Sequence, residues 1–445
     1  MSAPYSVKLD EHSARHFTDK GATILLLDVP LQTHVAFDHQ SFVTGRKFKG
    51  VKMLPPGTHM VSYNAASRTG DFSPTTSFFV HLAPEQVYIR RWNCEHELLE
   101  DISADEAEPY AAGVRRFDFD QSLAPYNLHA YQQWQNLSGY ISKQTISKLS
   151  PLPSGNISIT AEADPAHLQP VTPAEKQLYA QLQEGRSTST ESDSAPMQVD
   201  GRQQPQTAAS DRAQDMHSMQ TPDLAPREGV GRCYYTQLPR LVKVAGMSPQ
   251  QLTALNLDKT GMLLQVLQKH YSGSGEELLG EVQFSFLAFL MGQSLEGFAQ
   301  WKAIIHLLLG CEEAPIRSHV QLFIKALRCL LCQLQHSLTQ EPAKALGASP
   351  KVGGQASGVD GPFGMAAMVE EFLADSFLQQ LFAKYFAMLA DEAPVLNRQL
   401  QSVSKQVQQL LEQRLGWDFQ VQGVGQDDDE DEYAPVVVQL DNVTL

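Results

Sequence analysis

Hydrophobic residues recur with two different spacings along this chain of 445 residues. In residues 23–91, apolar or β-branched runs such as TILLLDV, HMVSY, TSFFVHL and EQVYIRRW are separated by Gly, Pro, Asn and Ser. Short runs bounded by turn-forming residues are typical of β-strands. The pattern therefore predicts a β-sandwich or barrel in the first part of the chain.

The apolar spacing becomes helical after this β-rich part. Between residues 125 and 149, apolar residues recur at intervals of three and four, as on one face of a helix. These residues are Leu128, Tyr131, Trp134, Leu137 and Ile141. Helices are thus expected to close a β-rich N-terminal domain of residues 1–182. The large aromatic side chains expected in its core are Phe78, Phe79, Trp92 and Trp134.

Residues 232–419 have the pattern of a second, helical domain. The expected helices lie at residues 277–291, 295–309, 316–338, 366–389 and 394–415. Ser248 before Pro249 has the pattern of an N-cap followed by a first helical position. The chain is therefore expected to be an α+β protein whose second domain is a helical bundle or short superhelix.

Two stretches lack the large apolar residues that a packed core needs. Residues 183–231 are rich in Ser, Thr, Gln, Pro and Asp, and residues 343–362 are rich in Gly, Ala and Ser. Such compositions do not offset the entropy lost on ordering, so we predict a disordered linker and a flexible insertion. Residues 420–445 are expected to form a flexible acidic tail with a terminal β-strand.

Charge and cysteine content narrow the class of protein. A net charge of −16 makes overall attraction to nucleic acid or to an anionic membrane unfavourable. Five cysteines, and a beginning without the basic and apolar regions of a signal peptide, indicate a reducing compartment. The most apolar stretch, residues 284–292, is too short to span a membrane.

Histidines of the β-rich part raise the possibility of a metal enzyme. His34, His39, His59 and His81 fall in this part, and a jelly-roll barrel with a histidine-bound metal would be an oxygenase or isomerase scaffold. No His-x-His pair or His-plus-carboxylate pattern at strand spacing accompanies them, which favours surface or singly hydrogen-bonded histidines. A cupin-like metal enzyme stays open as an alternative.

Other candidate chemistry is weaker. Cys329 and Cys332 have redox spacing but lie in an apolar helical run, where cysteine acts as a small hydrophobic residue. No nucleophile elbow, P-loop or dinucleotide fingerprint is present in the sequence. The densest basic stretch, residues 45–59, interleaves cations with Phe48, a pattern that can bind RNA. Four cations in a strongly acidic chain are a small patch, which favours a strand and turn facing an acidic protein partner over direct RNA contact.

Four stretches together resemble the A1-cistron splicing factor family. They are FKGVKMLPPGTH, LAPYNLHAYQQWQNLSGYISKQTISKLSP, LGEVQFSFLAFLMGQSLEGFAQWKAIIHLLL and the ending WDF followed by EYAPVVVQL. The resemblance covers about residues 23–182 and 233–440 in the same order. It leaves out the low-complexity linker and residues 343–362.

The resemblance implies a non-catalytic assembly factor of the U5 small nuclear ribonucleoprotein, without a cofactor. Family members bind the large U5 scaffold protein, pre-mRNA-processing-splicing factor 8, at its RNase H-like and Jab1/MPN domains, and exclude the U5 helicase until maturation. The resemblance also implies a helical domain similar to VHS and ENTH superhelices, and a cytoplasmic and nuclear location. Neither a membrane nor a small-molecule substrate is expected, and a membrane-trafficking adaptor is disfavoured because the helical domain lacks lipid-facing basic clusters.

The end of the chain suggests how a partner is held. Six acids at residues 427–432 precede a valine run that suits addition to an exposed sheet edge of a partner. The predicted partner-binding residues are Ala434, Pro435, Val436, Val437, Val438, Gln439 and Leu440. The alternative is that this strand folds back onto the chain's own β-domain.

Release from the partner is implied to depend on phosphorylation. The most accessible candidates lie in the Ser/Thr cluster of the predicted linker, and Ser248 at a predicted helix start is the alternative. The possible phosphorylation sites are Ser187, Ser189, Ser192 and Ser248.

Overall fold

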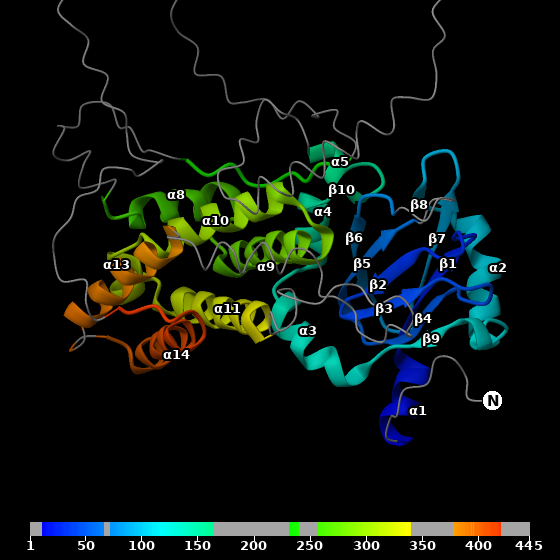
Figure 1. Ribbon diagram of the computed structural model, residues 1–445, viewed down its shortest axis with the longest axis horizontal. Coiled ribbons are helices and arrows are strands. Elements are labelled where there is room, and N and C mark those ends of the chain that lie inside the picture. The colour runs from blue at the N-terminus through cyan, green and yellow to red at the C-terminus, as the bar shows by residue number, and fades with distance from the viewer. Residues whose placement is uncertain are drawn as a thin grey trace, which may run out of the picture.

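A β-rich part and a helical part lie side by side in the computed structural model (Figure 1). The structure describes residues 11–65, 72–162, 231–239, 257–339, 377–392, 394 and 396–419. The protein is thus α+β, with the sheets at the N-terminal end and the helices after them. None of the described helices is both long and apolar enough to cross a membrane.

Two five-stranded sheets form the β-rich part. The first has the order β8-β7-β1-β4-β9 and the second β10-β6-β5-β2-β3. The strands of the first sheet are β1 (Ala22–Leu27), β4 (Gly50–Leu54), β7 (Val87–Asn93), β8 (Leu98–Asp101) and β9 (Ala124–Pro125). Those of the second are β2 (His34–Phe37), β3 (Gln40–Val43), β5 (Gly57–Asn64), β6 (Thr76–Leu82) and β10 (Ile157–Ser158).

The two sheets pack face to face as a sandwich. Their shared core contains Leu26 of β1 and Trp92 of β7 from the first sheet, and Val35 of β2 and Phe78 of β6 from the second. The pairing of β1 with β7 is parallel, whereas the second sheet is antiparallel throughout. Of the two predicted forms, sandwich or barrel, the structure is the sandwich.

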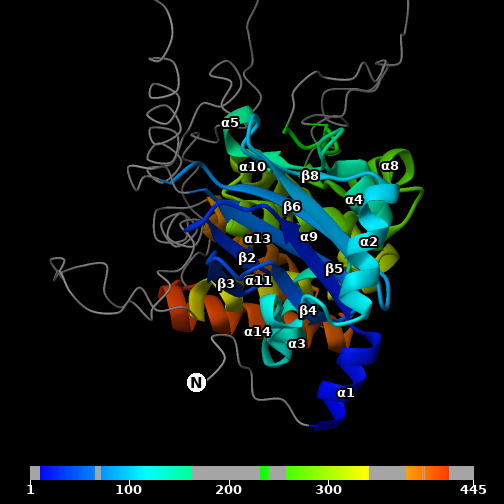
Figure 2. The ribbon, with the colours of Figure 1, turned by 90° about the vertical axis from the view of Figure 1, so that its right-hand side faces the viewer.

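Helix α2 (Ala104–Arg115) covers the other face of the first sheet. Leu25 of β1 and Ile89 of β7 pack there with Ala111 of the helix. Ser103 caps the helix by accepting the backbone N–H of Glu106. Helix α1 (Glu11–Lys20) leads into β1, and Figure 2 shows it projecting below the sheets. The sequence pattern predicted neither helix.

Short helices connect the sandwich to the helical part. They are η1 (Asp120–Ser122), η2 (Leu128–Ala130), α3 (Tyr131–Ser138), α4 (Lys143–Leu149) and α5 (Ile159–Glu162). Ser142 and Thr145 form a reciprocal capping box at the start of α4. The closing helices predicted from apolar spacing are therefore present, but as several short pieces.

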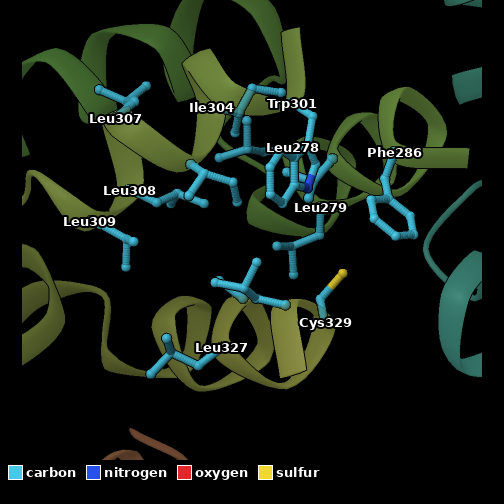
Figure 3. Close-up of a cluster of buried hydrophobic side chains, with 14 of the residues drawn as sticks. Leu278, Leu279, Phe286, Trp301, Ile304, Leu307, Leu308, Leu309, Leu327 and Cys329 are labelled. Carbon is cyan, nitrogen blue, oxygen red and sulfur yellow. The ribbon is translucent and has the colours of Figure 1, made fainter. Parts of the chain in front are cut away.

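The helical part contains α8 (Thr260–His270), α9 (Gly275–Gly292), α10 (Leu295–Leu309), η3 (Ala314–Ser318), α11 (Val320–Thr339), α13 (Phe377–Asp391) and α14 (Arg398–Leu415). Figure 3 shows side chains of α9, α10 and α11 meeting in its core, with Leu279, Trp301 and Leu327 among them. Helix α11 begins four residues later than predicted because a π-helical turn precedes it.

Candidate partner-binding platform

The second sheet packs against the first sheet on its inner face and carries the helical part on its outer face. Met60 of β5 and Phe79 of β6 point outward and belong to the same hydrophobic core as α9 and α10. The ring of Phe79 stacks on that of Phe284 in α9, with centroids 4.3 Å apart. The junction between the two parts is therefore built on buried apolar side chains, as a core is.

Helix α3 and the turn after it seal this junction with hydrogen bonds. The indole N–H of Trp134 donates to the carbonyl of Thr58 at 2.7 Å, and the Thr58 hydroxyl donates to the carbonyl of Ile141 at 2.5 Å. The amide of Gln283 in α9 donates to the carbonyl of Asn136 at 3.0 Å and accepts the backbone N–H of Tyr140 at 2.7 Å. The first two bonds tie α3 and the turn after it to the sheet, and the two bonds of Gln283 tie α9 to them, so together they orient α9 on the sheet.

Two glycines let α9 approach its neighbours closely. A Cβ on Gly280 would lie 2.6 Å from the carbonyl oxygen of Tyr140, and one on Gly292 would lie 2.6 Å from the Ser77 hydroxyl. The next residue, Gln293, has a left-handed backbone and accepts the hydroxyl of Thr75 at 2.8 Å. Side chains larger than hydrogen would push α9 off the sheet and off α4.

Two buried acids lie at the same junction. Glu281 of α9 accepts the hydroxyl of Tyr271 at 2.9 Å and contacts residues 231–239. Glu162 of α5 accepts the Ser294 hydroxyl at 2.5 Å and the backbone N–H of Glu296 at 3.2 Å, at the start of α10. Burial, together with the nearby Glu296 carboxylate, raises the pKa of Glu162 to about 8.

A buried ion pair lies inside the sandwich. His59 bonds through Nδ1 to the carboxylate of Asp38 and through Nε2 to the carbonyl of Pro55, both at 2.7 Å. The hydroxyl of Tyr126 and the backbone N–H of Met60 also donate to Asp38. Burial alone would lower the pKa of His59, but the charge of Asp38 and these hydrogen bonds outweigh it and raise the pKa above its ordinary value.

The other three histidines considered as metal ligands, His34, His39 and His81, do not meet one another. His34 lies tilted against the ring of Phe72, His81 contacts the Thr58 hydroxyl, and His39 faces His336 of α11 with ring centroids 5.0 Å apart. Within the residues that the structure describes, no three His, Cys, Asp or Glu side chains gather so as to hold a metal ion.

A small polar pocket lies where α3 meets α11. It has a volume of about 120 Å³ and is lined by Gln133, Asn136, Leu137, Cys332, Gln335 and His336. Burial, reinforced by His39, lowers the pKa of His336 to about 4, so the imidazole is neutral near pH 7. The pocket therefore offers neutral hydrogen-bonding groups rather than charge.

The Cys-x-x-Cys pair on α11 consists of two free thiols. Cys329 is buried, and burial raises its pKa to about 12. Burial also raises the pKa of Cys332. Since the thiolate is the reactive form, this environment favours the packing role expected from the sequence.

The basic stretch of residues 45–59 does not form an aromatic stacking surface. Phe48 is buried against Phe37 and Phe42. Lys52 pairs with the Asp120 carboxylate, and Arg46 and Lys47 are exposed. Only part of the predicted cationic surface is thus available to a partner.

An apolar patch remains uncovered on the outer face of the second sheet. His34 and Val43 are cross-strand neighbours on β2 and β3, and the ring of Phe72 lies 4.4 Å from that of His34. Val43 is 48% exposed and Phe72 is 52% exposed. We call His34, Val43 and Phe72 the β3-side patch. It lies at an edge strand, so both a side-chain surface and a strand edge are available there.

The residues predicted to bind a partner or accept phosphate lie outside the described residues. These are the seven tail residues from Ala434 to Leu440, and Ser187, Ser189, Ser192 and Ser248. The predicted linker, except Gly231, and the insertion at residues 343–362 also lie outside them. These predictions stay open, as do the predicted domain boundaries.

The sequence reasoning did not find the junction itself. Phe78, Phe79, Trp92 and Trp134 are all buried, as expected. Alternation along β6 gives Phe78 and Phe79 opposite faces, and that alternation was the available signal that one of them leaves the sandwich core. Glu281 gave no such signal, because acids on a predicted helix are usually solvated, and Glu162 lies outside every predicted helix and strand.

Comparison with protein families matches both parts of the chain. The AAR2 N-terminal domain matches residues 20–151, and the AAR2 C-terminal repeat region matches residues 235–420. The two matches follow the order of the sandwich and the helical part along the chain.

Curated relatives match over nearly the whole length. Protein AAR2 homolog of Mus musculus is 28% identical, and that of Homo sapiens 26%, each over 98% of both chains. Protein AAR2 homolog of Caenorhabditis elegans is 28% identical over 90% of this chain and 95% of its own.

Proposed function

Because this chain belongs to the AAR2 splicing factor family, we propose that it is a non-catalytic assembly factor of the U5 small nuclear ribonucleoprotein. The observation that carries this proposal is the match of family domains to both parts of the chain, in order and with relatives of nearly equal length. In this role the protein supports pre-mRNA splicing and acts in the cytoplasm and the nucleus.

The partner in this proposal is the U5 scaffold protein, pre-mRNA-processing-splicing factor 8. The chain binds its RNase H-like and Jab1/MPN domains and keeps the U5 helicase away until the particle matures. The platform supports this role, because Phe79, Trp134 and Gln283 join two folded parts into one continuous surface. A VHS- or ENTH-like arrangement of the helical part belongs to the same proposal.

The acidic tail supplies the second contact as an added strand. Val436, Val438 and Leu440 would share one face of an extended strand, with Val437 on the other. Acids before the run keep the free strand solvated and prevent it from pairing with itself. The tail thus binds by backbone pairing, and the platform binds by its shape and side chains.

Deletion of residues 427–445 tests the proposal, with binding to a purified scaffold fragment of both domains as the readout. We expect affinity to fall at least tenfold while the melting temperature of the free protein stays unchanged. An unchanged affinity together with a melting temperature several degrees lower would show that the strand belongs to the chain's own sheet.

Backbone pairing has a sharper test at Val437. Proline removes the N–H and fixes φ, whereas alanine only shortens the side chain. Each lost ladder bond costs about 0.5 to 1.5 kcal/mol, so Val437→Pro should weaken scaffold binding more than Val437→Ala. Equal effects of the two substitutions would argue against an added strand.

Binding of the partner to the folded part of the protein is tested at the β3-side patch. Phe72→Ser and Val43→Ser should weaken binding of the scaffold fragment, because exposed apolar side chains beside a free strand edge suit a protein partner. Phe117→Ser is the matched control, since Phe117 is 60% exposed but lies after α2. If the control loses as much affinity as the patch variants, the patch is not the contact.

Release is proposed to follow phosphorylation, since each phosphate adds roughly 1.5 to 2 negative charges. Glutamate at Ser187, Ser189, Ser192 or Ser248 mimics that charge. At least one of the four variants should bind the scaffold fragment more weakly than the corresponding alanine variant. Unchanged binding in all four would mean that none of these residues is the switch.

A further inference from the structure

An extended segment of residues 231–239 connects the two parts of the molecule. It has no helix or strand of its own, and in the sequence it lies between stretches that the structure does not describe. Figure 1 shows it in green beside α5 and α10. We call residues 231–239 the strap.

The beginning of the strap pairs with the end of the β-rich part. The carbonyl of Gly231 accepts the backbone N–H of Ser158 at 3.0 Å, and the N–H of Tyr234 donates to the carbonyl of Leu149 at 2.9 Å. Gly231 has φ of +103°, and a Cβ there would lie 3.0 Å from the side chains of Ser158 and Ala161. The fit therefore requires glycine at this position.

The middle of the strap is held by a buried carboxylate of the helical part. Thr236 donates its N–H and its hydroxyl to the two carboxylate oxygens of Glu281, both at 2.8 Å. The amide of Gln300 in α10 donates to the Thr236 carbonyl at 2.9 Å, and Lys148 of α4 donates to the Thr236 hydroxyl at 3.3 Å. Side chains of α4, α9 and α10 thus form hydrogen bonds to the backbone and the side chain of Thr236.

Side chains on either side of Thr236 complete the recognition. The ring of Tyr235 meets that of Phe284 at 6.2 Å in a T-shaped arrangement. Arg232 pairs with the Glu296 carboxylate at the start of α10. By contrast, Gln237 is exposed.

We propose that Leu149, Ser158, Glu281, Glu296 and Gln300 form a peptide-binding site, which the strap fills as an intramolecular ligand that clamps the two parts together. The ligand is an extended peptide with a hydroxyl residue that donates twice to a carboxylate. An aromatic residue precedes the hydroxyl residue, and a basic residue lies four positions before it. The strap holds the parts together independently of the covalent linker, and a process that withdraws it would loosen the junction.

The direct test supplies the strap as a separate molecule. In the full chain, residues 231–239 are replaced by a glycine–serine segment of equal length, and a fluorescent peptide of the native sequence of these residues is titrated in. We expect saturable binding to the replaced chain, and at least tenfold weaker binding to the native chain, whose site is filled.

Peptide variants show whether Glu281 recognises the strap. A Thr236→Val peptide should bind at least tenfold more weakly, because it cannot donate a hydroxyl to Glu281. A Gln237→Ala peptide is the control and should bind like the native one, because Gln237 faces solvent. Equal binding by the two variant peptides, or equal binding of the native peptide to both chains, overturns the proposal.

A second measurement covers the case in which the replaced chain does not fold. Glu281→Gln is made in the otherwise native chain, and Glu277→Gln on the same helix is the control. Amide hydrogen exchange at Tyr234 and Thr236 should accelerate at least tenfold in the first variant and not in the second. Unchanged exchange in Glu281→Gln overturns the proposal.

Discussion

The two faces of the second sheet pack against different parts of the molecule, and they are held by different means. Its inner face meets the first sheet through aliphatic and aromatic side chains such as Val35, Val61 and Phe78. The outer face presents Thr58 and Phe79 to the helices and combines apolar contact with directed hydrogen bonds. One sheet thus serves as half of a core on one side and as a docking surface on the other.

The polar groups Arg90, Asp38 and His59 lie in the core between the two sheets and are paired. Arg90 contacts Asp101 and Asn156 and lies 3.9 Å above the ring of Phe78. Asp38 and His59 form hydrogen bonds with one another and with three further groups, of Pro55, Met60 and Tyr126. A buried charge without such partners would cost several kcal/mol, so these pairs add specificity within an apolar core.

At the outer face, hydrogen bonds decide how the two parts are oriented. Apolar contact alone is non-directional and would tolerate sliding of α9 over the sheet. The bonds from Trp134 to Thr58 and from Gln283 to Asn136 exist in only one orientation. The difference teaches that the sandwich gains stability chiefly from buried area, whereas the platform gains its defined shape from polar contacts.

The largest expected effect separates the two faces at adjacent residues. Phe78→Ala and Phe79→Ala remove the same side chain from opposite faces, and each should cost about 3 to 5 kcal/mol. We expect Phe78→Ala to destabilise the sandwich itself. Phe79→Ala should uncouple the helical part, so that thermal unfolding splits into two transitions. Calorimetry distinguishes them, and a single shared transition in both variants would contradict the comparison.

The buried ion pair gives the next largest effect. Asp38→Asn leaves His59 without its counter-charge and should cost about 3 kcal/mol in chemical denaturation. The raised pKa of His59 stabilises the fold fully below its unfolded value of about 6.5, and this stabilisation is lost as pH rises through the folded value. That pH dependence should vanish in Asp38→Asn and persist in Asp101→Asn, whose carboxylate is exposed.

Replacing Gly280 at the outer face by alanine should destabilise the protein, although alanine normally stabilises a helix relative to glycine. Alanine is the better helix former by about 1 kcal/mol, yet Gly280→Ala should destabilise by about 1 to 3 kcal/mol. The added Cβ would lie 2.6 Å from the backbone oxygen of Tyr140, which cannot move without shifting the turn before α4. Gly416→Ala at the C-cap of α14 meets no atom and carries only the strain of its φ of +68°. If the two substitutions lower the free energy of unfolding equally, the close packing of α9 against Tyr140 does not determine the cost at Gly280.

Sequence patterns predicted the elements that contain long apolar runs or regular helical spacing and missed those with neither. The strands of continuous apolar runs, such as β1 and β6, and the apolar helices α9 and α10 were all expected. The β2–β3 hairpin was not, because its turn uses Asp38 with a φ of +52° where a glycine would have marked it. Helix α2 was not predicted because it buries only Ala111 and Gly113 and contains Pro109.

The junction between the second sheet and the helical part could not be predicted from the sequence, for a physical reason. A strand buried on both faces shows which residues are covered but not what covers them. Phe79 could have met another sheet, a helix or a partner, and only the fold selects Phe284. Likewise, Glu281 became a ligand for the strap only when Thr236, distant in sequence, was brought beside it.

The last prediction distinguishes the acid of the junction from the ion pair of the core. Burial raises the pKa of Glu162 to about 8, above its unfolded value of about 4.5. The protonated form is therefore favoured by folding, and its stabilisation is full below about pH 4.5 and lost as pH rises toward 8. For one titrating group the loss is at most about 1.4 kcal/mol per pH unit. Hydrogen bonds from Ser294 and Glu296 favour the charged form and make the loss smaller. Glu162→Gln removes this titration, so the stability of the variant should gain on that of the native chain as pH rises from 5 to 8. Parallel stability profiles over this range would show that the carboxyl is already ionised in the folded protein and that the start of α10 holds it as an anion.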